Sequence, residues 1–367
     1  MNPHNTSSRI VFFSKMAQAV PAIGPAQTEA GGTFVTNRSG TLDFFRRNYP
    51  KCRAIKYHSP LPNLWPAGRA LKNARVIVTG AGHRKILDRY TAPRAMLFHG
   101  TYRNLTPKHV RELAPFDHVF LLGPRMERML NRCEFSFTYS VTGYAPFSEF
   151  PDATTEHREK TLAKLGLASD QPTILYAPAR RSCGSWVELA ESIAGDIPPG
   201  YNLIMRPHPI QVFNAKPDEK RLYDRVTNIL RDRGNAVIDL ADYPFPEVMS
   251  IADLLIADGT SPNEEFMFYN RPQIITETYP REKWRKEYEE QGMHPDDVEE
   301  LMGLYDCVAS WRENRQKGRT RLIEDCLANP DAGADLRRQY FTSAFGKNPR
   351  GAAIRVAEEL HHFLDRA

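Results

Sequence analysis

Polar side chains follow four apolar segments of the sequence, each of which is typical of a buried strand. The stretches in which these segments end are RAMLFHG (94–100), YAPARR (176–181), MRPHP (205–209) and ADGTSPNEEF (257–266). Their polar residues include His99, Arg180, Arg181, Arg206, His208, Asp258, Thr260, Ser261 and Glu265. Imidazoles exchange protons near neutral pH, and guanidinium and hydroxyl groups bind phosphate oxygens. These residue types therefore favour acid–base chemistry on a phosphorylated ligand.

The segment that begins at Asp258 combines several features of an anion site. A glycine and two hydroxyl residues, Thr260 and Ser261, lead into a predicted helix with Pro262 in its first turn. The N–H groups and the dipole at a helix start attract anions. The same pattern, with acidic residues three or four positions later, is also that of an ordinary helix cap. Taken alone, the segment leaves both interpretations open.

The histidines and arginines also have ordinary structural interpretations. His208 stands between two prolines, which give a rigid strand exit suited to preorganised electrostatics, but a solvated histidine in a surface turn has the same pattern. His99 fits a general base or a satisfied core histidine, and Arg180 and Arg181 fit phosphate ligands or solvated charges. Because all four segments fall where an α/β fold binds its ligand, we favour the functional interpretation.

Short apolar runs alternate with helical patterns along the chain, which is typical of parallel sheets with helical crossovers. Strands are predicted over 9–13, 32–36, 52–58, 74–80, 94–100, 117–123, 138–143, 172–178, 201–209, 235–240, 252–259 and 271–276. Helices are predicted over 42–49, 107–113, 124–132, 186–194, 220–233, 245–250 and 262–269, with charged helical stretches at 281–301 and 308–328 and an amphipathic helix over 351–364.

The polar, proline-bearing segment 144–160 divides this pattern into two parts. We therefore predict an α/β protein of two doubly wound, Rossmann-type domains that face a central cleft, where the ligand binds. The predicted boundaries are 1–150 and 151–350, followed by a C-terminal helix over 351–367.

Composition excludes several other classes of protein. The net charge of +5 is small beside 49 basic and 44 acidic residues, so no nucleic-acid partner is expected. No apolar run approaches the roughly 20 residues that span a bilayer, and the N-terminus does not read as a secretory signal. The five scattered cysteines suggest neither disulfides nor a zinc site. We expect a cytoplasmic protein.

The order of these motifs resembles the CDP-glycerol glycerophosphotransferase family, the teichoic-acid primases and polymerases with a GT-B fold. FHGT (98–101) stands in place of the family's Trp-His-Gly-Thr, and YAPARR in place of Tyr-Ala-Pro-Thr-Trp-Arg. Arg206, His208 and Pro209 match Arg-Leu-His-Pro. The stretch ADLLIADGTSPNEEFMFYNRP (252–272) matches most of the family's last motif, with Glu265-Phe266 as its acidic-Phe pair.

The resemblance implies an acceptor-side first domain and a nucleotide-donor-binding second domain. The expected reaction moves glycerol phosphate or a similar polyol phosphate from a CDP-linked donor to a hydroxyl of a teichoic-acid, capsule or other cell-surface glycan acceptor, and releases CMP. His99 would be the general base, and the family places its second catalytic histidine at His208. The donor would contact Arg180, Arg181, Arg206, Asp258, Thr260, Ser261 and Glu265. No metal or other cofactor is expected.

Two alternatives remain at this level: a GT-B glycosyltransferase that uses a nucleotide sugar, and a non-catalytic nucleotide-binding assembly protein. The basic and aromatic residues Trp284, Arg285 and Lys286, with those over 311–317, suggest a weak peripheral contact with the inner face of the cell membrane. An ordinary solvated helical face explains the same residues.

Overall fold

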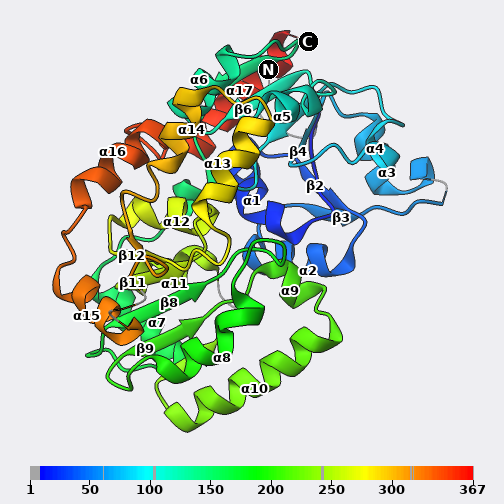
Figure 1. The fold of residues 1–367 in the computed structure, drawn as a ribbon. Coiled ribbons are helices and arrows are strands. Elements are labelled where there is room, and N and C mark those ends of the chain that lie inside the picture. Colours follow the sequence, from blue (N-terminus) through cyan, green and yellow to red (C-terminus); the bar gives the residue numbers. More distant parts are fainter. Residues whose placement is uncertain are drawn as a thin grey trace. The chain divides into compact units, whose positions relative to one another are not determined.

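The computed structural model describes residues 9–366 apart from residues 61, 102–104, 241–243, 315 and 317. The chain forms two compact units, one made of Met1–Glu149 with Ser343–Ala367 and the other of Phe150–Thr342. Each unit contains one parallel sheet with helices packed against it (Figure 1). The chain passes between the units twice, first within the proline-bearing segment 144–160 and again near residue 342.

The first unit holds a seven-stranded sheet in the order β3-β2-β1-β4-β5-β6-β7. The strands are β1 (Ile10–Phe13), β2 (Thr33–Thr36), β3 (Ala54–Lys56), β4 (Val76–Thr79), β5 (Arg94–Leu97), β6 (His118–Leu121) and β7 (Thr138–Val141). The helices are α1 (Val20–Ala30), α2 (Ser39–Asn48), α3 (Pro66–Lys72), α4 (Arg84–Leu87), α5 (Pro107–Glu112), α6 (Pro124–Asn131) and α17 (Ala352–Arg366). Alternate residues of β1 enter two separate hydrophobic cores, which explains why the whole strand is apolar.

The second unit holds a six-stranded sheet in the order β10-β9-β8-β11-β12-β13. The strands are β8 (Thr173–Ala177), β9 (Asn202–Met205), β10 (Ala236–Ile238), β11 (Leu254–Ala257), β12 (Gln273–Ile275) and β13 (Ala309–Ser310). The helices are α7 (Thr155–Leu165), α8 (Trp186–Asp196), α9 (Pro209–Phe213), α10 (Pro217–Arg233), α11 (Phe245–Ile251), α12 (Ser261–Phe266), α13 (Arg281–Glu290), α14 (Pro295–Met302) and α15 (Arg319–Ala328), and α16 (Ala334–Phe345) leads out of the unit. No helix in the described part of the chain has the length and apolar character needed to cross a bilayer.

Every predicted strand is present, but the helical prediction over 308–328 is wrong in its first part. Residues 309–310 form β13, and the backbone N–H of Trp311 donates to the Ile275 carbonyl at 2.8 Å. Gly318, with φ 74°, precedes the helix, which begins only at Arg319. Pairing with a distant strand overrides the local helical pattern here. Helix α1 was not predicted, because it contains Pro21 and Pro25.

The strand order reverses once in each sheet, between β1 and β4 in the first and between β8 and β11 in the second. At these points the crossovers leave the central strands in opposite directions, and ligands of open α/β sheets bind there, beyond the carboxyl ends of the strands. The register pairs Phe13 with Thr79 and Ala177 with Ala257 at the two positions.

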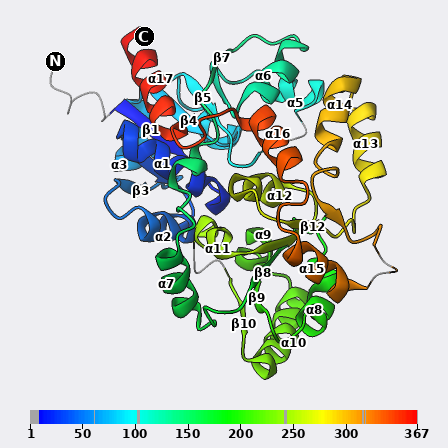
Figure 2. The same cartoon turned by 90° about the vertical axis from the view of Figure 1, so that its left-hand side faces the viewer.

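The C-terminal helix α17 returns to the first unit and packs along α1 (Figures 1 and 2). Val356, Ala357, Leu360 and Leu364 are buried in the same core as α1. The spacing of these residues places them on one face of the helix, as the amphipathic pattern predicted. The sequence pattern did not indicate which sheet this face would cover.

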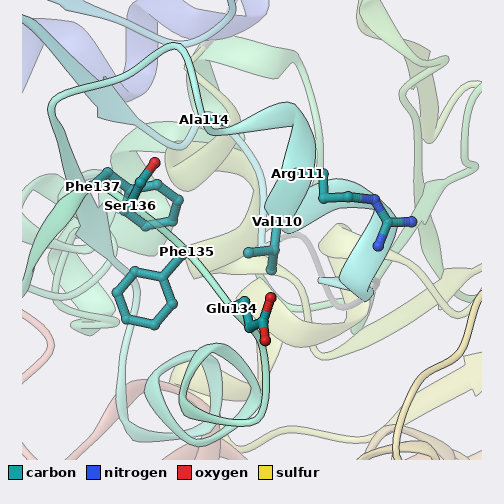
Figure 3. A pocket seen from close by; sticks show the side chains of 7 residues that line it. All are labelled: Val110, Arg111, Ala114, Glu134, Phe135, Ser136 and Phe137. Atoms are coloured by element: carbon teal, nitrogen blue, oxygen red, sulfur yellow. The ribbon is translucent and has the colours of Figure 1, made fainter.

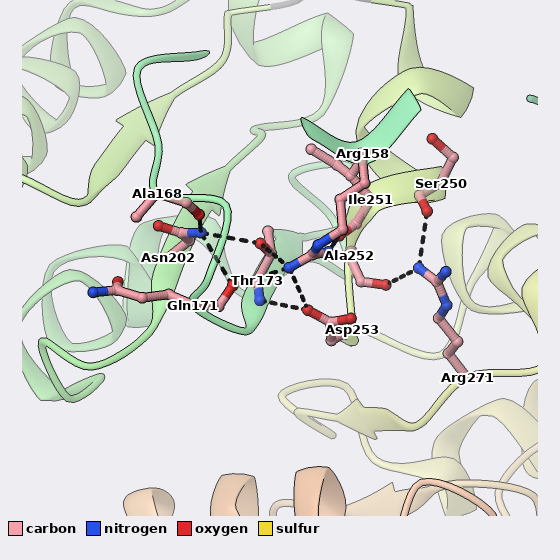
Figure 4. A network of polar contacts seen from close by, with 10 residues as sticks. All are labelled: Arg158, Ala168, Gln171, Thr173, Asn202, Ser250, Ile251, Ala252, Asp253 and Arg271. Atoms are coloured by element: carbon pink, nitrogen blue, oxygen red, sulfur yellow. Dashed lines mark hydrogen bonds and ion pairs between the residues drawn. The ribbon is translucent and has the colours of Figure 1, made fainter. Parts of the chain in front are cut away.

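A polar network fixes the starts of the central strands in the second unit (Figure 4). The Arg158 guanidinium, from α7, pairs with the Asp253 carboxylate at 2.9 Å and donates to the carbonyls of Gln171 and Ile251. The same carboxylate accepts from the backbone N–H of Thr173 at 2.7 Å. These contacts lie at the amino-terminal edge of the sheet, so they support the fold and leave the opposite edge to the ligand.

We expect Arg158→Ala to destabilise the second unit by about 2–4 kcal/mol, because it leaves partly buried carbonyls and a carboxylate without their donor. Urea unfolding followed by tryptophan fluorescence measures this, since Trp186, Trp284 and Trp311 lie in that unit. Arg231→Ala, on the exposed face of α10, is the matched control and should change stability by less than about 0.5 kcal/mol. Equal effects of the two substitutions would contradict the assignment.

Candidate functional site

The Asp258 carboxylate organises the switch point of the second sheet. It is buried just after β11 and accepts hydrogen bonds from the backbone N–H groups of Ala179 at 2.6 Å and Ser185 at 3.0 Å. It also accepts one from the Thr276 hydroxyl, after β12. Asp258 therefore holds the loop that follows β8 in place, and its carboxylate faces protein donors.

The two arginines of that loop differ in their surroundings. Arg181 forms a two-point ion pair with Glu219, at 2.6 Å for each contact, and donates to the Asn214 carbonyl at 2.7 Å. Arg180 is exposed, and its charge acts on His208. Arg181 thus fastens the loop to the start of α10, and Arg180 is the better placed of the two to meet a phosphate.

Arg206 leaves the end of β9 and is buried in an ion pair with Asp239, which itself is buried at the end of β10. Its guanidinium also lies over the Phe245 ring, 5.0 Å from the centroid. Each of these buried charges stabilises the other, because a single buried charge would lose its hydration without the compensation of an ion pair. In this structure Arg206 secures the strand exit that carries His208.

His208 caps α9, and the contact defines its tautomer. Its Nδ1 accepts a hydrogen bond from the backbone N–H of Ile210 at 3.1 Å, so the ring proton of the neutral form resides on Nε2. Burial, together with the charges of Arg180 and Arg181, lowers the pKa of His208 to about 4. At neutral pH the side chain is therefore an uncharged N–H donor held in a fixed position.

The start of α12 is capped by a residue that sequence reasoning missed. The Asn263 side-chain oxygen accepts from the backbone N–H groups of Gly259 at 2.8 Å and Thr260 at 3.3 Å. The Thr260 hydroxyl is buried and has no hydrogen-bond partner among the described residues. Because the helix has only 6 residues, its dipole is small, and the hydroxyl is the stronger reason to expect a ligand here. Ser261 is half-buried beside it, and Glu265 is buried one turn later.

His99 lies in the first unit, two residues after β5. Its Nδ1 is 3.1 Å from the carbonyl oxygen of Gly80, which follows β4. A carbonyl can only accept, so Nδ1 carries the proton and Nε2 carries the lone pair. Burial lowers the pKa of His99, and the Gly80 contact partly opposes this. A Cβ on Gly80 would lie 3.2 Å from Nδ1, so glycine is what permits this close approach.

The predicted site residues therefore divide by unit and by role. His99 belongs to the first unit and the others to the second. Arg180, His208, Thr260 and Ser261 lie at the carboxyl edge of the second sheet, and Arg181, Arg206 and Asp258 position that edge through protein contacts. Their partners Glu219 and Asp239 were not predicted. Asp239 stands near the end of the predicted strand 235–240, which is the signal that could have identified it.

A surface pocket of about 350 Å³ lies elsewhere in the first unit (Figure 3). Val110, Arg111 and Ala114 line it from α5 and the turn after it, and residues 134–137 line it from the segment before β7. Both segments precede strands, so the pocket lies at the amino-terminal edge of the sheet, away from His99. The described residues contain no cluster of three or more His, Cys, Asp or Glu side chains that would hold a metal ion. Metal-free chemistry stays a prediction.

The lowered pKa of His208 predicts a pH dependence of stability. The unfolded chain takes up this proton near pH 6.5 and the folded chain only near pH 4, so stability should fall as the pH drops through that window. His208→Asn keeps an acceptor at the helix cap but does not titrate, and should lose less stability over the same window. Thermal unfolding of both proteins at several pH values measures the difference. Identical pH profiles would show that His208 is not held neutral.

The sequence pattern of the CDP-Glycerol:Poly(glycerophosphate) glycerophosphotransferase family matches residues 110–325, more than half of the chain. A comparison with curated proteins finds no match. Among solved structures, the wall teichoic acid polymerase TagF is similar with a TM-score of 0.64 and 16% identity, over 100% of this chain and 91% of that chain. HepE from Anabaena, solved with UDP and glucose, has a TM-score of 0.54 and 11% identity over 98% of this chain and 99% of that chain. A glycosyltransferase from Rickettsia africae has a TM-score of 0.52 and 13% identity over 97% of each chain.

These structures confirm the predicted GT-B-like α/β fold class, and the match to the family confirms the resemblance seen in the motifs. The matched range includes every predicted donor-side residue and begins after His99. The chain belongs to the CDP-glycerol:poly(glycerophosphate) glycerophosphotransferase family.

Proposed function

We propose that this chain transfers a polyol phosphate, such as glycerol phosphate, from a CDP-linked donor to a hydroxyl of a teichoic-acid or capsule-type acceptor, and releases CMP. The observation that carries the proposal is the opposite hydrogen bonding of two imidazoles. His99 donates from Nδ1 and His208 accepts at Nδ1, so one ring offers a lone pair at Nε2 and the other an N–H. Transfer of a phosphoryl group to an alcohol uses both functions.

His99 acts as the general base in this proposal. Its Nε2 takes the proton of the acceptor hydroxyl while that oxygen attacks the phosphorus distal to the nucleoside. The bond from this phosphorus to the bridging oxygen breaks, and CMP leaves with the bridging oxygen. Burial keeps the His99 imidazole neutral at physiological pH, as a base must be before the reaction.

The donor diphosphate binds at the switch point of the second sheet. The His208 Nε2–H, the Arg180 guanidinium and the Thr260 hydroxyl supply hydrogen bonds and charge to the leaving phosphate, with Ser261 beside them. Arg181, Arg206 and Asp258 act through the positions they impose on these groups. Glu265 binds donor hydroxyls, on the ribose. No step of this scheme requires a metal ion.

The proposed membrane contact involves the region around Trp284 and Arg285. Trp284 stacks on Tyr288 and packs at a tilted angle against Tyr279, and Arg285 pairs with Glu299. Because much of the basic charge of this region is already paired within the protein, attachment to the inner face of an anionic membrane would be weak and salt-sensitive. Residues 315 and 317 of the proposed contact lie outside the described residues.

Incubation with a panel of CDP- and UDP-linked polyols and sugars, with an acceptor, tests the reaction type. We expect a CDP-polyol to give CMP, because the proposed scheme breaks the diphosphate bridge. CMP release should continue with EDTA present, because no step of the scheme uses a metal ion. Mass analysis of the released nucleotide gives the answer. Release of a nucleoside diphosphate would assign the chain to sugar transfer, and binding without any turnover would assign it to a nucleotide-binding assembly role.

We expect His99→Ala to lower kcat by about 10²-fold or more, with donor affinity nearly unchanged, because the base acts on the acceptor. His362→Ala, an exposed histidine of the same unit, is the control and should retain full turnover. Turnover by folded His99→Ala that equals the control would remove His99 from the mechanism.

A further inference from the structure

We propose that Lys15 and His83 form an anion-binding site at the switch point of the first sheet, which holds a phosphate group of the acceptor beside His99. This inference rests on the proposed function and assigns to it two residues that recognise the acceptor. Such a site favours an acceptor that carries a phosphate ester near its reacting hydroxyl, as a teichoic-acid acceptor does, over a neutral sugar or alcohol.

The topology brings the two residues together. Phe13 of β1 pairs with Thr79 of β4, and the order of strands reverses between them. Lys15 lies two residues beyond Phe13, and the loop 80–83 continues from Thr79. This is the position at which open parallel sheets bind anionic ligands. In the sequence, this ligand-binding position is indicated only by two glycines within the short run that ends at His83.

His83 has features that the fold alone does not explain. Its Nε2 is buried and has no hydrogen-bond partner among the described residues. Its ring stands edge-on to Phe13, with the centroids 5.3 Å apart. Its φ of 41° is in the left-handed region, which is unfavourable for a residue with a side chain. A strained backbone that holds an unpartnered polar atom is typical of a ligand site.

Lys15 supplies the charge. It is half-buried and forms no ion pair within the described part of the chain. Burial of His83, together with the charge of Lys15, lowers the pKa of His83 to about 4, so the imidazole is neutral beside a cation. The nearby hydroxyls of Ser14 and Thr79 donate to carbonyls of their own turns, those of Met16 at 3.3 Å and Ala81 at 2.9 Å. An anion bound here would thus pair with the Lys15 ammonium group and contact the His83 ring.

The same loop contacts the proposed base. The carbonyl of Gly80 accepts a hydrogen bond from Nδ1–H of His99. The space beside Gly82 is open, because a Cβ atom built there would have no neighbour closer than 3.9 Å. A phosphate held by Lys15 and His83 would place the adjoining part of the acceptor next to the His99 ring.

Calorimetric titration of sn-glycerol 3-phosphate and of glycerol, without donor, tests the site directly. The wild-type protein should bind glycerol 3-phosphate more tightly than glycerol. Lys15→Ala and His83→Asn should each weaken glycerol 3-phosphate binding by about tenfold or more, with CMP affinity unchanged. Asparagine tolerates the left-handed backbone, so His83→Asn should remain folded. Lys72→Ala, an exposed lysine on α3, is the control and should bind like the wild type.

Unchanged affinity in both variants, or equal binding of glycerol and glycerol 3-phosphate by the wild type, would overturn the proposal. The outcome is separable from that of the proposed function. Loss of glycerol 3-phosphate binding in the variants, in a protein that releases CMP from no donor, would support the site and reject the transfer reaction. CMP release with no effect of Lys15→Ala on binding would reject the site alone.

Discussion

The site in the second unit depends on one buried carboxylate. Asp258 accepts hydrogen bonds from the loop after β8 and from the hydroxyl after β12, so it joins the ends of three strands. Hydrogen bonds to a charged group contribute about 1.5–3 kcal/mol each, and a buried N–H left without its acceptor costs about 1–3 kcal/mol. The position of Arg180 relative to His208 follows from this constraint, because both ends of its loop are held by the same carboxylate.

A second layer of ion pairs supports this arrangement from the sides. Arg181 joins the loop to α10 through Glu219, and Arg206 joins the exit of β9 to the end of β10 through Asp239. Such ion pairs fix the positions of the side chains and loops that they join. They add little net stability, because desolvation offsets most of their attraction. The arginines that look most like phosphate ligands in the sequence thus include two that position the site.

Burial and hydrogen bonding determine the protonation of the histidines at the ends of these strands. Burial lowers the pKa values of His83, His99 and His208, which favours the neutral form of all three imidazoles at neutral pH. The hydrogen bond at Nδ1 then determines which ring nitrogen holds the proton in His99 and His208. A carbonyl partner and an N–H partner produce opposite tautomers from the same side chain.

The sequence by itself determined the strands, their parallel arrangement and the family, because apolar runs, turn residues and the order of short motifs are local properties. It also identified His99 and His208 as residues at strand ends. Only the tertiary structure decided what each polar group contacts. Ala179 and Asp258 are 79 positions apart, Arg206 and Asp239 are 33 apart, and β13 is a strand only because β12 lies beside it. The tautomer of His99, which depends on the Gly80 carbonyl, and the burial of Arg206 follow from such distant partners, which no local pattern of residues can specify.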